Sequence, residues 1–339
     1  MKHESFFLET EDQQKLRAML WIPEKECRCI LVICHGMTEH ITRYESLAET
    51  LTSAGIITAG FDLRGHGTLA PKGPVAYMEE DGWLRSIEDL HRFHGILIRR
   101  FPNLPISVMG FSLGSFLVRD TLSRYPNDYQ SAIIAGTGDQ PSWILMPLIK
   151  KMEKEVAKAG LQETTPLVEK LSFETYNQKF KSTTSRFDWL CSDVASRREY
   201  EADPGCKESI SAGLFCDLLK SMKRTGELSF LAGWEKDLPV LLLSGAEDPV
   251  GNFKKGVLSF AKKLKKAGHP YVECVLLPNA RHDLFHEYEN GAAGEAASVL
   301  KLFLLKQLFT DNSNLMTQGV SLHADSPLAD ASGTDSRVR

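Results

Sequence analysis

Residues 106–114, with the sequence ISVMGFSLG, give the strongest indication of the fold. Its first four residues form a short apolar run typical of a buried strand, and residues 113–124 have helical spacing. Between them, Gly110 and Gly114 flank Ser112 at two residues on either side. This spacing suits a tight strand–turn–helix connection that lifts the serine out of the sheet edge. The N-terminus of the following helix then points at developing negative charge. The pattern therefore predicts Ser112 as a nucleophile.

Apolar runs alternate with helical patterns on both sides of this motif. Further buried-strand runs occupy residues 30–34, 56–61, 132–135, 239–243 and 271–277, and helical patterns occupy residues 44–54, 83–101, 250–268 and 292–309. Continuous apolar strands separated by helices indicate an α/β fold with a mostly parallel, doubly wound sheet covered on both faces. Residues 5–9 and 16–21 are separated by a polar turn and predict an antiparallel pair at the start of the chain.

The strand pattern stops in the middle of the chain. Residues 141–235 contain helical patterns without a buried-strand run. This predicts a helical cap, residues 137–236, inserted into an α/β core of residues 1–136 and 237–310. Residues 311–339 are rich in Asp, Ser, Gly and Ala and lack aromatic residues. This composition predicts a flexible tail.

A serine hydroxyl needs a base and an orienting acid, which follow the serine in chain order when the strand–turn–helix motif carries it. Asp248 comes soon after the strand run at 239–243 and is the predicted acid, with Glu247 as the rival. His282 follows the last strand run and is the predicted base, with His286 as the rival. Both residue types occur at the strand ends where the chemistry needs them.

A second anion donor is expected after the strand run at 30–34, where His35-Gly36-Met37 follows. The backbone N–H groups of Met37 and Leu113 are predicted to form an oxyanion hole, in which one donor contributes roughly 3–4 kcal/mol to the transition state. The alternative interpretation of His35-Gly36 is a plain tight turn.

Three further polar residues are predicted to be structural. Asp62 and His66 follow the strand run at 56–61 among glycines and are expected to hold loops by hydrogen bonds. His94 lies in an apolar helical stripe and is expected to be a buried histidine with satisfied hydrogen bonds.

The cap begins with an apolar helical stripe. Its predicted substrate-binding residues are Trp143, Ile144, Met146 and Ile149. These side chains could line an acyl tunnel or touch a membrane surface, or they could only pack the cap onto the core. Lys150 and Lys154 would suit an anionic lipid surface, but the interleaved Glu153 favours an ordinary solvated face.

Five motifs together resemble a known family: HGMTEH at 35–40, FDLRGHG at 61–67, GFSLG at 110–114, GAEDPVG at 245–251 and NARHD at 279–283. Their order and spacing resemble the monoacylglycerol lipase and lysophospholipase branch of the α/β hydrolases, which is grouped with serine aminopeptidases. The match spans about residues 15–310. The cap segment FDWLCSD at 187–193, with Tyr200 and Asp203-Pro204, is similar to bacterial members.

This resemblance implies a triad of Ser112, Asp248 and His282, with Met37 and Leu113 as oxyanion donors. Animal monoacylglycerol lipases carry small residues after the His-Gly pair, where this chain has Met37. The resemblance therefore leaves the glycerol preference open.

The sequence predicts a serine carboxylic ester hydrolase that acts through an acyl-enzyme and needs no metal or organic cofactor. An amidase or peptidase could use the same triad. A non-catalytic binding protein is disfavoured because no triad member is missing, and a dehalogenase because its nucleophile is normally Asp. The expected partner is an acyl ester or monoacyl lipid, with transient membrane contact through the cap as a further possibility. The oligomeric state is not predicted.

Composition sets broader limits. The net charge of −4 over 339 residues gives no sign of nucleic-acid binding. No signal peptide or membrane-spanning run is recognised, which predicts a cytoplasmic location. The seven cysteines are odd in number and lack zinc-ligand spacing, so we expect reduced packing cysteines.

Overall fold

The computed structural model describes residues 1–70, 75–180 and 183–310. Eight strands form one sheet in the order β1-β2-β4-β3-β6-β7-β9-β10. The strands are β1 (Lys2–Glu9), β2 (Lys15–Ile22), β3 (Cys29–Cys34), β4 (Ile56–Phe61), β6 (Ile106–Phe111), β7 (Ser131–Ala135), β9 (Val240–Gly245) and β10 (Val272–Leu277). The pairs β1–β2 and β2–β4 are antiparallel and all other pairs are parallel, which confirms the predicted mostly parallel sheet.

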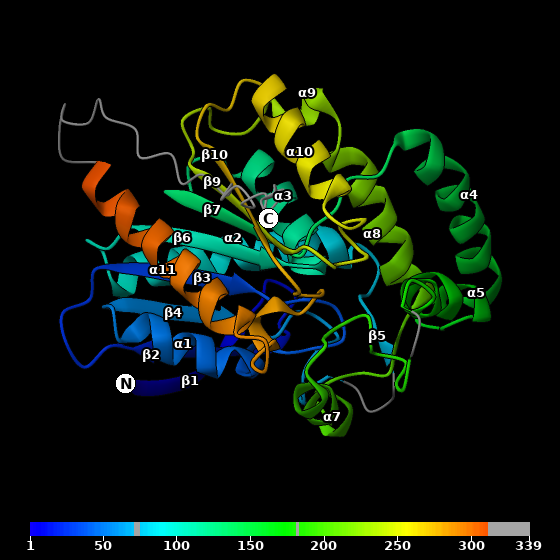
Figure 1. Cartoon of the computed structure of the whole chain (residues 1–339), viewed down its shortest axis with the longest axis horizontal. Coiled ribbons are helices and arrows are strands. Elements are labelled where there is room, and N and C mark those ends of the chain that lie inside the picture. The colour runs from blue at the N-terminus through cyan, green and yellow to red at the C-terminus, as the bar shows by residue number, and fades with distance from the viewer. Residues whose placement is uncertain (71–74, 181–182, 311–339) are drawn as a thin grey trace, which may run out of the picture.

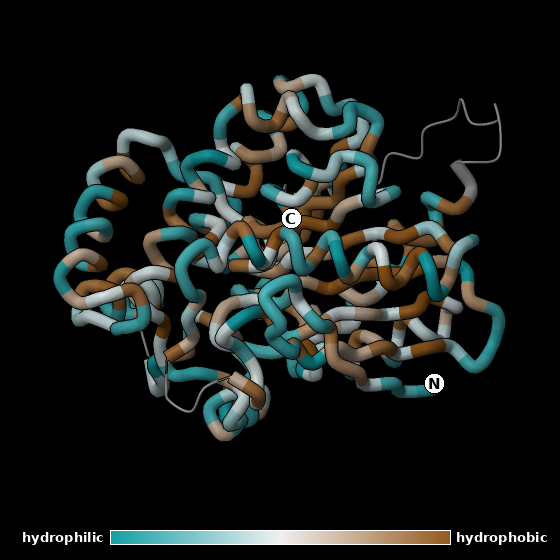
Figure 2. Tube along the Cα trace, turned by 180° about the vertical axis from the view of Figure 1, so that it is seen from behind, coloured by the Kyte–Doolittle hydropathy of each residue, from teal (hydrophilic) through white to brown (hydrophobic). Residues whose placement is uncertain are grey.

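Helices cover both faces of this sheet. On one face lie α2 (Gly82–Arg100), α3 (Leu113–Arg124) and α10 (Lys255–Lys266), whose apolar side chains join the larger core cluster. On the other face lie α1 (Glu45–Thr52) and α11 (Ala292–Thr310), in front of the strands in Figure 1. Because both faces are covered, β3, β4, β6, β7 and β9 are buried along their full length. Figure 2 shows these strands as the hydrophobic centre of the molecule.

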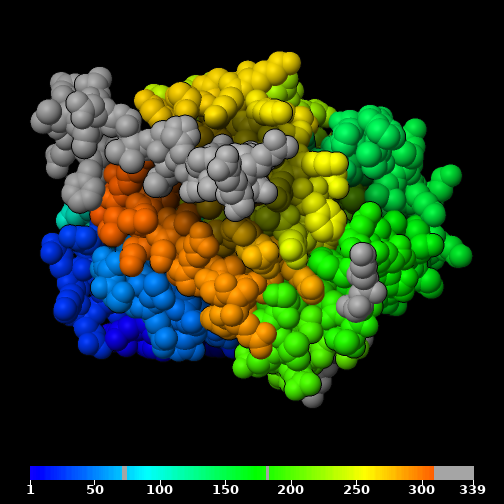
Figure 3. Space-filling view, viewed as in Figure 1, coloured from blue at the N-terminus to red at the C-terminus, as the bar shows by residue number. Residues whose placement is uncertain are grey.

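We use "cap" for residues 137–236, whose boundaries as a domain stay a prediction. Its elements are α4 (Ser142–Ala159), α5 (Pro166–Glu169), η2 (Lys170–Glu174), α6 (Thr175–Asn177), α7 (Val194–Ala202), β8 (Ser209–Ile210), α8 (Ala212–Thr225) and α9 (Leu228–Leu231). The two-residue strand β8 pairs with β5 (Val75–Ala76), which belongs to the core, so the cap is joined to the core by a short ladder. In Figures 1 and 3 the green cap lies on the opposite side of the view from the N-terminal strands.

One predicted helix is shorter than expected. The pattern predicts a helix over 250–268, but α10 begins at Lys255. Asn252, Phe253 and Lys254 have positive φ angles of 48°, 50° and 78°, which an α-helix cannot contain. The chain instead turns back, and the Phe253 amide donates to the Asp248 carbonyl at 2.9 Å. The predicted tail at 311–339 lies outside the described residues. Within the described residues, no helix is both long enough and apolar enough to span a membrane.

Candidate active site

Ser112 stands at the turn between β6 and α3, with φ = 52° and ψ = −115°. A non-glycine residue rarely adopts this conformation, so the surrounding contacts must impose it. The two glycines explain how. A Cβ on Gly110 would lie 2.3 Å from the Gly114 carbonyl oxygen, and one on Gly114 would lie 2.0 Å from the Cys34 carbonyl oxygen. The motif therefore permits α3 to approach β6 and β3 closely and projects the serine from the strand end.

The structure brings Ser112, His282 and Asp248 together. Nε2 of His282 lies 2.8 Å from Oγ of Ser112, and Nδ1 lies 2.9 Å from Oδ2 of Asp248. Asp248 is fully buried and also accepts a hydrogen bond from the Val250 amide at 2.8 Å. The imidazole ring packs beside Phe111, with the ring centroids 5.0 Å apart. Three residues far apart in the chain thus form one hydrogen-bonded line.

The geometry separates the predicted residues from their rivals. The Glu247 side chain is exposed, whereas Asp248, one residue later, faces His282. His286 lies in the short helix η3 (Leu284–His286), where Nδ1 bonds Asp283 at 2.8 Å and Nε2 lies 3.1 Å from the Arg43 carbonyl oxygen. Both nitrogens of His286 are therefore occupied away from Ser112.

The loop after β3 carries the first predicted oxyanion donor. The Gly36 amide donates to Oε1 of Glu39 at 2.6 Å, which bends the loop immediately before Met37. Met37 lies in the wall of the cavity that contains Ser112. Leu113, the second predicted donor, is the first residue of α3. Amides at the start of a helix have no partner within that helix and are available to an anion.

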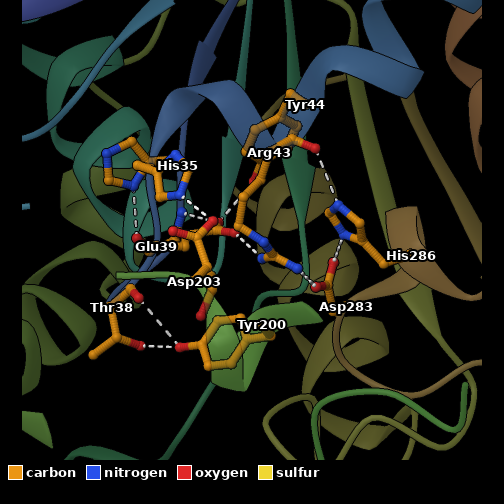
Figure 4. A network of polar contacts seen from close by, with 12 residues as sticks. His35, Thr38, Glu39, Arg43, Tyr44, Tyr200, Asp203, Asp283 and His286 are labelled. Carbon is orange, nitrogen blue, oxygen red and sulfur yellow. Dashed lines mark hydrogen bonds and ion pairs between the residues drawn. The ribbon is translucent and has the colours of Figure 1, made fainter. Parts of the chain in front are cut away.

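A buried charge network lies beneath this loop (Figure 4). Nη1 of Arg43 donates to Oε2 of Glu39 at 2.5 Å, and Nη2 donates to Oδ2 of Asp283 at 2.9 Å. The Tyr44 hydroxyl donates to Glu39, and His286 bonds the second oxygen of Asp283. Burial would raise the pKa of Asp283, but the charges of His286 and Arg43 and their hydrogen bonds hold it below its ordinary value. We call residues 35–40 the oxyanion loop, after the donor predicted there. The network links this loop to Asp283, the residue that follows His282.

Asp62, His35 and His66 hold the neighbouring loops, as predicted for Asp62 and His66. Nε2 of His35 accepts from the Leu63 amide at 2.9 Å, so Nδ1 carries the proton and donates to the Gly36 carbonyl oxygen at 2.7 Å. Asp62 accepts from the Ile41 amide at 2.9 Å. Burial lowers the pKa of His66 to about 4 and that of His35 well below its ordinary value, so both rings are neutral at pH 7.

The cap is fastened to the same loop. The hydroxyls of Thr38 and Tyr200 lie 2.6 Å apart, and Nε2 of His40 lies 2.8 Å from Oδ2 of Asp203. The Lys207 amide donates to the Thr38 carbonyl oxygen at 2.9 Å. Residues 200–207 of the cap are therefore bound directly to the segment that carries the predicted oxyanion donor.

The cavity at Ser112 has a volume of about 20 Å³, little more than one water molecule needs. Its core side consists of residues from the oxyanion loop together with Phe111, Ser112 and His282. Its cap side consists of Phe173, Trp189, Leu190 and Tyr200. Phe173 and Trp189 are almost fully buried, and the Trp189 ring packs 5.1 Å from the His282 ring between centroids.

The four predicted substrate-binding residues of the cap lie apart from this cavity, and a role for them in substrate binding stays a prediction. Trp143, Ile144, Met146 and Ile149 are all absent from the walls of this cavity. The apolar residues of α4 form two faces instead of one stripe. Leu145, Ile149 and Met152 are buried where α4 packs on α8, whereas Trp143 is 76% exposed and Ile144 and Met146 are also exposed. The residues that do line the cavity come from 173–200, where the sequence offered only the FDWLCSD motif and Tyr200 as a signal.

Comparison with known proteins finds one matching family model and several relatives that are named as lipases. The family model described as serine aminopeptidase, S33, matches residues 25–289. A monoacylglycerol lipase of Mycolicibacterium smegmatis is 28% identical over 139 residues, covering 41% of this chain and 48% of that protein. The chain thus matches about half the length of that relative. The human monoglyceride lipase is 23% identical over 296 residues, covering 81% of this chain and 86% of that protein.

Solved structures agree on the fold. The crystal structure of a thermostable carboxyl esterase from Bacillus coagulans in complex with glycerol superposes with a TM-score of 0.80 at 20% identity, covering 91% of this chain and 99% of that chain. At this identity the likeness establishes the fold alone, which is the α/β-hydrolase fold. The family model matches residues 25–289, which is more than half of the chain. The chain therefore belongs to the serine aminopeptidase S33 family of α/β hydrolases.

Proposed function

We propose that this protein hydrolyses carboxylic esters of monoacyl lipids, with Ser112 as nucleophile, His282 as base and Asp248 as orienting acid. The observation that carries the proposal is the position of His282, within 2.9 Å of both Ser112 Oγ and Asp248 Oδ2. In this arrangement His282 takes the hydroxyl proton while Asp248 fixes the tautomer and stabilises the imidazolium. The names of the relatives support ester hydrolysis of the monoacylglycerol lipase type.

The reaction has two steps. Ser112 attacks the ester carbonyl carbon, and the oxyanion is held by the amides of Met37 and Leu113. His282 then gives its proton to the departing alcohol, leaving an acyl-enzyme. A water molecule, deprotonated by His282, attacks the acyl carbon. The bond to Ser112 Oγ breaks, His282 returns its proton to that oxygen, and the carboxylic acid leaves. Every proton in this cycle passes through Nε2 of His282.

The cavity walls support an acyl substrate. Phe111, Phe173, Trp189 and Leu190 present apolar surface beside Ser112. Because the cavity has room for about one water molecule, a lipid enters only when cap side chains move away from the serine. We therefore propose that substrate binding moves Phe173, Trp189 and Leu190 away from the core side of the cavity.

Amide hydrolysis is the second candidate, because the matching family model carries the description serine aminopeptidase. A substrate with a free amino terminus needs an unpaired carboxylate near the serine. Among the residues that line the cavity, Glu39 is the only carboxylate, and it is already bonded to Arg43, Tyr44 and the Gly36 amide. This pairing favours the ester over the aminoacyl amide.

The exposed apolar face of α4 supports transient contact with a lipid surface. Trp143, Ile144 and Met146 are exposed together near the start of the helix, and Lys150 follows one turn later. Exposed apolar groups beside lysine suit the interface of an anionic bilayer. A cytoplasmic location stays a prediction.

The test combines covalent labelling with an ester panel. A fluorophosphonate probe is expected to label the wild-type protein and to leave Ser112→Ala unlabelled. Asp248→Asn is expected to lower kcat about 10⁴-fold, while Glu247→Gln stays within about twofold of wild type. The panel runs from acetyl to palmitoyl esters, with a matched aminoacyl amide. Labelling of Ser112→Ala would refute the nucleophile, and hydrolysis of the amide alone would replace the ester proposal.

A further inference from the structure

Two histidines on α2 face one carboxylate outside the candidate active site. His91 and His94 are three residues apart and so lie on the same side of the helix. Asp128 comes from the connection between α3 and β7 and points between them. Its Oδ2 lies 2.6 Å from Nδ1 of His91 and 3.7 Å from Nδ1 of His94. One ligand atom from each residue falls within 4.8 Å of the others.

We infer that His91, His94 and Asp128 form a site for a divalent first-row transition cation, with Zn²⁺ as the expected ion. Imidazole nitrogens with one carboxylate oxygen suit Zn²⁺, whereas Ca²⁺ and Mg²⁺ prefer oxygen ligands alone. Two ligands of tetrahedral Zn²⁺, each at about 2.0–2.1 Å, lie about 3.3–3.4 Å apart. The 2.6 and 3.7 Å separations from Asp128 bracket this value, and the two imidazole nitrogens lie within 4.8 Å of each other. Side-chain rotations would then bring the three donors onto one ion.

The surroundings hold both rings in place. The His91 ring stacks on Tyr125 with centroids 3.8 Å apart and planes 6° from parallel. The His94 ring meets the edge of Tyr129 at 5.0 Å. The His94 side chain is 7% exposed and that of Asp128 14%, whereas that of His91 is 44% exposed. A cation can therefore enter from solvent beside His91, and a remaining coordination position is open to water.

The other cluster of metal-binding residue types in the described chain does not offer the same chemistry. It contains His40, Asp203 and Cys206. Nδ1 of His40 is already bonded to the Thr42 hydroxyl at 2.8 Å, so only Nε2, which lies 2.8 Å from Asp203, is left for an ion. Burial raises the pKa of the Cys206 thiol well above its ordinary value, which disfavours the thiolate that Zn²⁺ needs. The comparison singles out the cluster on α2.

The inferred site is separate from the proposed ester hydrolysis. None of its three residues lines the cavity at Ser112. A bound ion would fasten α2 to the turn before β7 and would stabilise the folded chain by linkage, because the unfolded chain lacks the assembled site.

The experiment uses the full chain, stripped with a chelator and titrated with Zn²⁺ by calorimetry. Wild type is expected to bind Zn²⁺ at this site, and His91→Ala and Asp128→Asn are each expected to bind it at least tenfold more weakly. His3→Ala, which removes another half-exposed histidine beside a carboxylate, is the matched control and should keep wild-type affinity. Hydrolysis of a soluble ester should be unchanged in all three variants.

Co²⁺ gives a second readout of the ligands. A site of nitrogen and oxygen donors gives visible d–d bands without the near-ultraviolet charge-transfer band of a thiolate, and these bands should disappear in Asp128→Asn. The proposal is overturned if both ligand variants keep wild-type affinity, if His3→Ala loses affinity equally, or if the cobalt spectrum shows thiolate ligation. Thermal melts of the metal-free variants verify that a lost site is not a lost fold.

Discussion

The two walls of the cavity are built differently. On the core side, Ser112 and His282 follow strand ends and are joined by a hydrogen bond of 2.8 Å, and a second bond of 2.9 Å joins His282 to Asp248 outside the cavity wall. On the cap side, Phe173 and Trp189 reach the cavity from short helices and turns and are held by packing against other aromatic rings. One wall is specified by backbone turns and polar contacts, and the other by the shapes of side chains that meet across the cap.

Because the two walls differ in this way, they should respond differently to substitution. A polar contact in a buried loop cannot be removed without leaving a partner unsatisfied, so single changes on the core side should be costly. An apolar wall can adjust by repacking, so single changes on the cap side should be tolerated better. Substitutions in each wall, each with a matched control, test this contrast.

The largest effect on stability is expected at Arg43. Arg43→Met leaves the buried carboxylates of Glu39 and Asp283 without their cation, and breaking a buried pair in this way costs about 3–5 kcal/mol. Urea unfolding monitored by circular dichroism measures the loss. Because the Glu39 carboxylate positions the Gly36 amide, kcat for an ester should also fall in the folded variant.

Arg124→Met is the control for this change. Arg124 makes an ion pair with Glu88 at 2.6 Å, but its side chain is 51% exposed, and exposed pairs contribute about 0–1 kcal/mol. Equal losses in the two arginine variants would contradict the view that buried polar contacts dominate the core wall.

The next effect is a pH dependence from His66. In the unfolded chain a histidine gains its proton near the ordinary pKa of 6.5, whereas the folded protein keeps His66 neutral down to about 4 because of burial. Between these values the unfolded state binds more protons, so the free energy of unfolding falls as the pH falls. The loss from this residue reaches about 3 kcal/mol below pH 4. The loss disappears well above pH 6.5, where His66 is neutral in both the folded and the unfolded state.

Substitution isolates this contribution. His66→Asn keeps a donor for the Arg64 carbonyl oxygen but cannot titrate, so its stability should decline less than that of wild type between pH 7 and 4. Urea midpoints across this range measure the difference. His3→Asn changes an exposed histidine and should retain the wild-type slope. Parallel curves for His66→Asn and wild type would show that the buried ring gains its proton without penalty.

The core wall could be predicted from the sequence because its requirements are local. Gly110 and Gly114 are needed because neighbouring backbone atoms leave no room for a Cβ at either position. This requirement is visible in the sequence as two glycines, each two residues from Ser112. Asp248 and His282 follow buried strand runs, and parallel strands bring their carboxyl ends to one edge. The alternating β1–β2 pair and the fully apolar β3 were equally visible.

The cap wall could not be predicted because its requirements are not local. The sequence predicts a single apolar face on α4, but α8 covers only Leu145, Ile149 and Met152. Periodicity alone does not say which side of a helix a neighbouring helix covers. The left-handed residues before α10 were missed for a similar reason, since Phe253 and Lys254 are not typical turn formers. The Arg43 network was missed because Asp283 lies 240 residues away in the chain.

The smallest effect is expected from the two tryptophans of the cap, which form a matched pair. Trp189 is 3% exposed and packs against His282, and Trp143 is 76% exposed on α4. Trp189→Ala should lower kcat/KM for a soluble short-chain ester about 10–100-fold, because a small displacement of the imidazole weakens its alignment with Ser112. Steady-state kinetics, which determine kcat and KM separately, measure this loss. Trp189→Phe should recover most of kcat.

Trp143→Ala should leave hydrolysis of the same soluble ester within about twofold of wild type, since the ring touches neither the cavity nor the core. With monoacyl lipid presented in anionic vesicles, the same variant should become slower, because its apolar surface is the part of α4 that a bilayer could accept. The two substrates therefore separate Trp189, which packs against His282, from Trp143, which we propose contacts a lipid surface. Equal losses of kcat/KM for the soluble ester in Trp143→Ala and Trp189→Ala would contradict this separation. The cavity would then extend to α4 during turnover, and α4 would belong to the cap wall.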